Sequence, residues 1–140
     1  MATVKEIAPH ALQPEHLRVA AYCRVSSDSE DQLHSYVAQI RNYTEVIAQH
    51  DGWELVDVYA DEGLTGTRMD KRDDFNRMMR DCRKGKIDRI LVKSVARFAR
   101  NTKECLASLR ELSGMGVTVR FEKENIDTGT LTTELMVSVS

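Results

Sequence analysis

The chain has 140 residues, of which 41% are hydrophobic and 30% are charged, and its formal net charge is −2. This length and composition fit one globular domain that buries a core without disulfide or metal support. No apolar run of about 18 residues and no signal peptide occurs, which argues against a membrane span or secretion and predicts a cytoplasmic protein.

The positive charge is unevenly distributed along the chain. Residues 68–103 hold 13 of the 20 Lys and Arg but only 5 of the 22 Asp and Glu, so this segment carries +8 and the remainder −10. Such a distribution predicts one basic face for a phosphate-rich partner. The alternative is a mixed, solvated surface on a helix.

Strand and helix patterns alternate after a first segment, residues 1–17, that we expect to be a poorly ordered extension. The periodicity predicts, in chain order, a strand at 18–25, a helix at 30–49, a strand at 53–61, a helix at 73–84, a strand at 87–94, a helix at 101–116 and a strand at 117–123. A new apolar pattern begins at Thr132 and stops with the chain.

The helices have recognisable starts and apolar faces. Ser29 and Gln32 resemble a capping box, and Asn101 or Thr102 is the expected N-cap of the helix at 101–116. The inward face of the first helix is predicted to comprise Leu33, Tyr36, Val37, Ile40, Tyr43 and Ile47. That of the second comprises Phe75, Met78, Met79 and Cys82.

This alternation predicts an α/β domain with three layers, in which helices flank a central, mostly parallel sheet of four to five strands. Ligands bind outside the carboxyl ends of the strands in such sheets. The loops after Ser26, Tyr59 and Val92 are therefore the expected site.

The alternation of side chains along the first strand predicts different places for two adjacent serines, Ser26 and Ser27. Alternate residues of a strand share a face, so Tyr22, Arg24 and Ser26 point one way together, whereas Ser27 begins the turn. Ser26 is thus the candidate nucleophile and Ser27 a helix cap. The alternative is that both serines only cap the helix.

Arginines follow the other strands. Arg97 and Arg100 are three residues apart and would face the same way on a helical turn, as an anion clamp requires. Arg68 and Arg72 add positive charge beside a glycine-containing loop. The alternative is that these arginines are ordinary surface residues.

Other chemistries have less support. The cysteines are odd in number and lack a Cys-x-x-Cys spacing, which predicts buried thiols and no zinc or disulfide framework. Arginines interleave with Asp70, Asp73 and Asp74 and would repel a metal ion, so a metal-dependent nuclease is disfavoured. Neither His-x-x-x-His nor Gly-x-Ser-x-Gly occurs, and the four histidines are scattered.

Six motifs occur in an order that resembles a known family. They are "YCRVSS", "AQI", "DEGLTGT", "KRDDF", "ILVKSVARFARN" and "ENIDT". Together they resemble the resolvase-like catalytic domain of the serine recombinases over about residues 18–140. The "RFARN" and "DEGLTGT" forms are most similar to the large serine recombinases of integrating and conjugative mobile elements.

The resemblance implies an activity. In this family a serine hydroxyl attacks a DNA phosphodiester, giving a 5′-phosphoserine linkage and a free 3′ hydroxyl, without metal, ATP or any other cofactor. The expected partner is double-stranded DNA, on which the full-length proteins act as homodimers that pair into a synaptic tetramer. A bacterial, phage or mobile-element source is also implied.

The resemblance also assigns residues. It makes Ser26 the nucleophile, and it matches Arg24, Gln39, Arg72, Arg97 and Arg100 to catalytic positions. Further residues expected to line the site or contact DNA are Tyr22, Thr65, Arg68, Lys93 and Ser94. Small resolvase-type members often carry Lys and Asp where this chain has Ser94 and Ala96, so an acid at Ala96 has no counterpart here.

The end of the chain completes the expectation. A long helix begins near Thr132 in the family, and here it stops at Ser140, which predicts a catalytic-domain fragment, residues 18–140, without a DNA-binding domain. Such a fragment should bind DNA weakly and not recombine it alone. The alternative function is a non-catalytic phosphate-binding or signalling module of flavodoxin-like fold, which would need acidic residues where the first strand has Arg24 and Ser26.

Overall fold

The computed structural model describes residues 16–25, 30–62 and 72–129. Within these ranges strands and helices alternate, as predicted. In chain order they are β1 (Leu17–Val25), α1 (Glu30–Gln49), β2 (Trp53–Glu62), α2 (Asp73–Arg83), β3 (Arg89–Val92), α3 (Val95–Phe98), α4 (Thr102–Gly114), β4 (Thr118–Phe121) and β5 (Ile126–Asp127).

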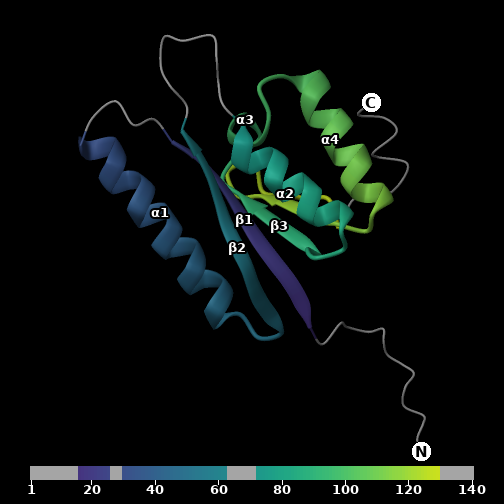
Figure 1. Cartoon of the computed structure of the whole chain (residues 1–140), viewed down its shortest axis with the longest axis horizontal. Coiled ribbons are helices and arrows are strands. Elements are labelled where there is room, and N and C mark those ends of the chain that lie inside the picture. Colours follow the sequence, from purple (N-terminus) through teal and green to yellow (C-terminus); the bar gives the residue numbers. More distant parts are fainter. Residues whose placement is uncertain (1–15, 26–29, 63–71, 130–140) are drawn as a thin grey trace, which may run out of the picture.

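The described strands form one sheet in the order β2-β1-β3-β4-β5. The first four are parallel, and β5 is a short antiparallel edge strand. Parallel neighbours need crossover connections, which here are the helices. Figure 1 shows α1 on one side of the strands and α2 and α4 on the other. This confirms the predicted three-layer, mostly parallel α/β fold.

The alternation along β1 supplies both cores. Val19, Ala21 and Cys23 pack with Tyr43 and Ile47 of α1. Ala20 and Tyr22 belong to the opposite core, which α2, α3 and α4 complete with Phe75, Met78, Phe98 and Leu112. Residues 19–22 are exposed by 1% or less. The predicted segregation of β1 side chains to two faces is therefore confirmed for residues 19–23.

Several boundaries differ from the prediction. Leu17, assigned to the extension, begins β1 and donates its N–H to the Gly52 carbonyl at 2.7 Å. The third strand ends at Val92, because Ser94 caps the short helix α3, which was not predicted. Asn101 is the N-cap of α4, and its side chain accepts the Glu104 N–H, as expected. The pattern from Thr132 and the capping box at Ser29 lie outside the described residues.

One residue of the predicted apolar face of α1 is misplaced. Tyr43 and Ile47 are buried, but Val37 is 47% exposed, so the prediction for Val37 is wrong. Figure 1 shows the reason, since α1 crosses the strands at an angle and its N-terminal end diverges from them. A periodic pattern identifies a helical face but not how much of it the sheet covers.

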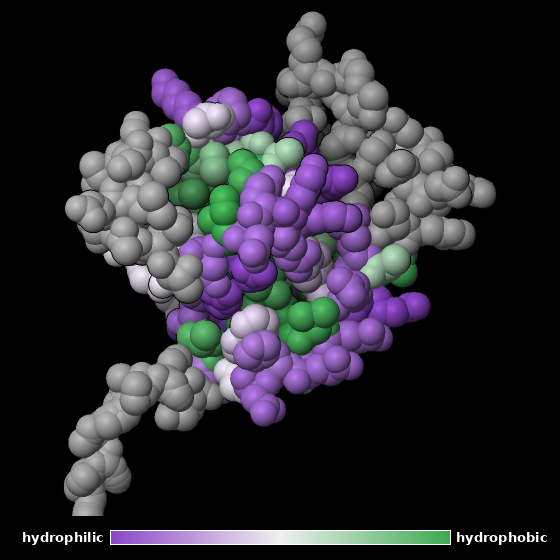
Figure 2. All heavy atoms as spheres, turned by 180° about the vertical axis from the view of Figure 1, so that it is seen from behind, coloured by the Kyte–Doolittle hydropathy of each residue, from purple (hydrophilic) through white to green (hydrophobic). Residues whose placement is uncertain are grey.

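The described surface is polar. Only Val37, Val46 and Ile126 are large exposed hydrophobic residues there, and Figure 2 shows charged and polar side chains around small apolar areas on the face seen from behind. Among the described residues, no helix combines the length and apolar character needed to span a bilayer. Cys23, Cys82 and Cys105 are free and buried, as predicted.

Candidate active site

Polar side chains gather where β1 and β2 end. Asp61, near the end of β2, is only 6% exposed and accepts the Tyr22 hydroxyl at 2.7 Å. Its two oxygens also accept the backbone N–H groups of Asp74 at 2.8 Å and Phe75 at 3.0 Å. The carboxylate therefore caps the start of α2 from a neighbouring strand, where a negative charge is favoured. Burial and the bond to Asp61 raise the pKa of Tyr22, so its hydroxyl stays a donor.

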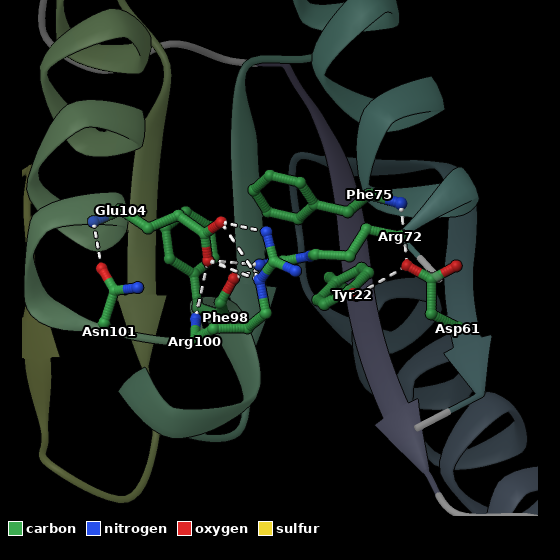
Figure 3. Close-up of polar contacts among 8 residues, drawn as sticks. All are labelled: Tyr22, Asp61, Arg72, Phe75, Phe98, Arg100, Asn101 and Glu104. Atoms are coloured by element: carbon green, nitrogen blue, oxygen red, sulfur yellow. Dashed lines mark hydrogen bonds and ion pairs between the residues drawn. The ribbon is translucent and has the colours of Figure 1, made fainter. Parts of the chain in front are cut away.

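Arg72 immediately precedes α2 and is buried, with a side chain only 6% exposed. Its guanidinium lies 3.9 Å from the centre of the Phe75 ring and 5.8 Å from that of Tyr22. It donates to the Phe98 carbonyl and, at 2.8 Å, to Glu104 Oε1 (Figure 3). Its Nε has no hydrogen-bond partner among the described residues. Contacts with Glu104, Phe98 and Phe75 therefore fix the Arg72 guanidinium in one position inside the fold.

Glu104 joins Arg72 to Arg100. Besides Arg72, its carboxylate accepts the backbone N–H of Arg100 at 2.7 Å and the Arg100 guanidinium at 2.9 Å. The hydrogen bonds from Arg100, with the charge of Arg72, lower the pKa of Glu104 to about 2. This ionised carboxylate thus brings together two arginines that are distant in sequence.

Arg97 and Arg100 do not share a helical turn, so that part of the clamp prediction is wrong. α3 ends at Phe98, and Ala99 has extended backbone angles that redirect the chain. Arg97 is exposed and donates to the Arg24 carbonyl at the end of β1, whereas Arg100 turns toward α4. Arg97 therefore meets β1, and Arg100 meets Arg72.

The other predicted site residues are not brought together with Arg72 and Arg100 by any described contact to Glu104. Ser94 is buried and caps α3 by accepting the Arg97 N–H at 3.3 Å, and Lys93 is exposed. Arg24 and Gln39 are half-buried, and Gln39 lies on α1, on the other face of the sheet from α2. Their places in one site stay predictions. Ser26, Thr65 and Arg68 lie outside the described residues.

Several basic residues of the segment 68–103 form ion pairs with acids from other parts of the chain. Arg77 pairs with Asp57, Arg83 with Glu111, and Arg89 with Asp127, and each of these acids lies outside the basic segment. Much of the excess of +8 is thus offset by pairing. Lys93 and Arg97, near the strand ends, are exposed. The clustering of Lys and Arg in the sequence therefore predicted a more basic face than the ion pairs leave.

Asp74, an acidic residue in the first turn of α2, has structural partners. Asp74 accepts the Ala60 N–H at 3.0 Å and the guanidinium of Arg77. Within residues 16–25, 30–62 and 72–129, no group of three or more His, Cys, Asp or Glu is arranged to hold a metal ion.

Sequence reasoning missed Asp61 and Glu104. Asp61 lies at the strand end that the ligand rule indicates, and that position was its signal. Glu104 lies four residues after Arg100, a spacing at which opposite charges on a helix meet. The contact of Glu104 with Arg72 spans 32 residues and has no local signal.

Comparison with known families identifies the family to which this fold belongs. The family model "Resolvase, N terminal domain" matches residues 19–140. The chain belongs to the resolvase family. Its members are site-specific recombinases, the enzyme class that the sequence motifs indicated, and DNA is their substrate. A search of curated proteins finds no match.

Solved structures agree with the family. A resolvase family site-specific recombinase from Streptococcus pneumoniae has 28% identity and a TM-score of 0.69, over 88% of this chain and 83% of that one. The N-terminal catalytic domain of TP901-1 integrase has 23% identity and a TM-score of 0.62, over 87% and 88%. The C-terminal catalytic domain of ISC1926 TnpA, an IS607-like serine recombinase, has 21% identity and a TM-score of 0.62, over 87% and 76%. The last two support the fold alone.

Proposed function

We propose that this recombinase domain cleaves and rejoins double-stranded DNA through a 5′-phosphoserine intermediate on Ser26, without metal or ATP. The observation that carries the proposal is the meeting of Arg72 and Arg100 at the Glu104 carboxylate, beside the ends of the parallel strands. A fixed pair of guanidinium groups suits a phosphodiester, whose transition state spreads negative charge over its oxygens.

The proposed step is a transesterification. The Ser26 hydroxyl loses its proton and its oxygen attacks phosphorus, so a Ser26 O–P bond forms as the P–O3′ bond breaks. The DNA 3′ oxygen leaves and takes up one proton to become a hydroxyl, which balances the proton lost from Ser26. One phosphodiester replaces another of similar energy, so attack by a 3′ hydroxyl reseals the strand and regenerates the serine.

The arginines divide the work in this proposal. Arg72 is preorganised by burial and by its contact with Phe75, so its donors need not reorganise when charge develops. Arg100 is more exposed, at 47% of its side chain, and can meet the phosphate from the solvent side. Arg97 holds the Arg24 carbonyl and thereby the end of β1 that leads to Ser26.

The assay is covalent capture in EDTA. The full-length protein is mixed with a duplex carrying the recombination site that it selects from randomised DNA, nicked beside the cleavage point so that a short fragment escapes. We expect an SDS-resistant adduct on the 5′ phosphate and a 3′ end that a polymerase can extend. Arg72→Ala and Arg100→Ala should each slow adduct formation by about a hundredfold or more.

Arg83→Ala is the matched control, because Arg83 lies on α2 and pairs with Glu111 away from the strand ends. It should keep the wild-type rate within about twofold. A need for divalent metal, or attachment through the 3′ phosphate, would reject the proposed chemistry.

We also propose that the active form on DNA is a homodimer that pairs into a tetramer, as the resemblance to serine recombinases implies. Analytical ultracentrifugation of the full-length protein with its DNA site should show masses of two and then four protein copies. A single copy that completes strand exchange would contradict this assembly.

A further inference from the structure

The Glu104 carboxylate binds two arginines of the candidate site, the buried Arg72 and the exposed Arg100. Oε1 accepts from Arg72 at 2.8 Å and from the Arg100 backbone N–H at 2.7 Å, and Oε2 accepts from the Arg100 guanidinium at 2.9 Å (Figure 3). These bonds tie the start of α2 to the α3–α4 connection. The two arginines are thereby held at one point.

The pairing is electrostatically necessary for Arg72. Its side chain is 6% exposed, and a buried cation without a counter-charge is strongly destabilised. Arg100 beside it would add repulsion. Since the pKa of Glu104 is lowered to about 2, the carboxylate is ionised at neutral pH. Without it, Arg72 would gain by turning toward solvent.

Glu104 is itself firmly placed. It occupies the first turn of α4, where the helix dipole favours an acid, and its N–H is bound by the Asn101 side chain at 2.8 Å. Arg72, Phe75, Arg100 and Glu104 line one groove of about 380 Å³ between α2 and α4. Glu111 lies on the same groove farther along α4, paired with Arg83 at 2.6 Å.

We propose that Glu104 is a positioning residue for the DNA reaction, which holds the Arg72 and Arg100 guanidinium groups in the arrangement that meets the scissile phosphate. This rests on the proposed function of those arginines. Glu104 does not touch the phosphate, since a carboxylate there would repel it. Its role is to fix two cations side by side while halving their net charge.

The proposal makes binding and chemistry respond in opposite ways. Glu104→Gln removes one negative charge next to the site, so DNA binding should be unchanged or tighter. The same change leaves the arginines misplaced, and a displacement of about 1 Å can cost a hundredfold in rate. A merely structural role would weaken both.

The test measures single-turnover adduct formation at saturating nicked duplex, together with the Kd for the same DNA. Glu104→Gln should slow the covalent step by about 10- to 100-fold with Kd unchanged or lower. Glu111→Gln, which removes the equivalent charge from the same helix and groove, should keep the rate within about twofold. Glu104→Asp keeps the charge but is one methylene too short to reach both arginines, so it should stay folded and still lose rate.

A double variant separates positioning from general damage. If Glu104 acts through Arg100, Glu104→Gln in an Arg100→Ala background should slow the reaction by no more than about threefold further. Full additivity of the two losses would overturn the proposal. So would a Glu104→Asp variant, folded by circular dichroism, that reacts at the wild-type rate.

The outcomes also separate this inference from the proposed function. Failure of the wild-type protein to form an adduct that Ser26→Ala abolishes would refute the proposed function. A normal wild-type adduct with Glu104→Gln as fast as Glu111→Gln would refute only the role of Glu104.

Discussion

Asp61 is predicted to be a main support of the site, because its buried carboxylate joins β2, β1 and α2. Asp61→Ala removes three hydrogen bonds, from the Tyr22 hydroxyl and from the N–H groups of Asp74 and Phe75. Bonds to a charged group contribute about 1.5–3 kcal/mol each, and three at the lower end give about 4.5 kcal/mol. Water that enters the vacated space would replace part of the lost hydrogen bonding, so the expected loss of unfolding free energy is about 4 kcal/mol.

Graded variants test this magnitude. Asp61→Asn keeps one acceptor oxygen and should lose about 2 kcal/mol, and Tyr22→Phe removes a single bond and should lose about 1 kcal/mol. The site should suffer as well, because Arg72 stands at the start of the helix that Asp61 caps. We therefore expect both Asp61 variants to slow adduct formation even where they remain folded.

The assay is urea unfolding followed by circular dichroism, with the slope of the transition checked for each variant. Domains of this size have about 5–15 kcal/mol of stability, so a loss of 4 kcal/mol is readily resolved. An Asp61→Ala variant that loses less than about 1 kcal/mol would refute the reasoning. So would an Asn variant as damaging as the Ala variant, since the retained oxygen would then have no effect.

Two further predictions concern titratable groups. The lowered pKa of Glu104 means that its ionised form stabilises the fold, so the wild-type unfolding free energy should fall as the pH drops from about 4.5 to about 2. Glu104→Gln should make this dependence on pH less steep. Urea unfolding at a series of pH values measures it, and an unchanged slope in the variant would contradict the ion pairs. Burial raises the pKa of the Cys23 and Cys82 thiols to about 12 and also raises that of Cys105, so Ellman's reagent at pH 8 should label these three cysteines only on unfolding, and rapid labelling of the native protein would show that they are accessible.

The fold was predictable because its signals are local. The apolar stretch at β1 alternates between two cores, and the spacing of Phe75, Met78, Met79 and Cys82 gave the buried face of α2. Each pattern covers a few residues and reflects burial alone. Val37 was misjudged because its exposure depends on the angle at which α1 crosses the sheet, which no local pattern reports.

The site was predictable only in part, for the same reason. Motif order indicated Arg72, Arg97 and Arg100, but the direction of each guanidinium depends on distant partners. Arg97 meets a carbonyl 73 residues away, and Arg72 meets Glu104 across 32 residues. Arg97 and Arg100 were expected to share a helical turn, but the extended backbone of Ala99 lies between them and separates α3 from α4.

The central claim is that Ser26 forms the covalent bond to DNA, and peptide mapping tests it most directly. The adduct trapped on the nicked duplex in EDTA is digested with nuclease and protease, and the modified peptide is sequenced by mass spectrometry. We predict a nucleotide phosphate on Ser26, abolished in Ser26→Ala and retained in Ser27→Ala. A phosphate on Ser27 or on any other residue, or an adduct that persists in Ser26→Ala, would contradict the account.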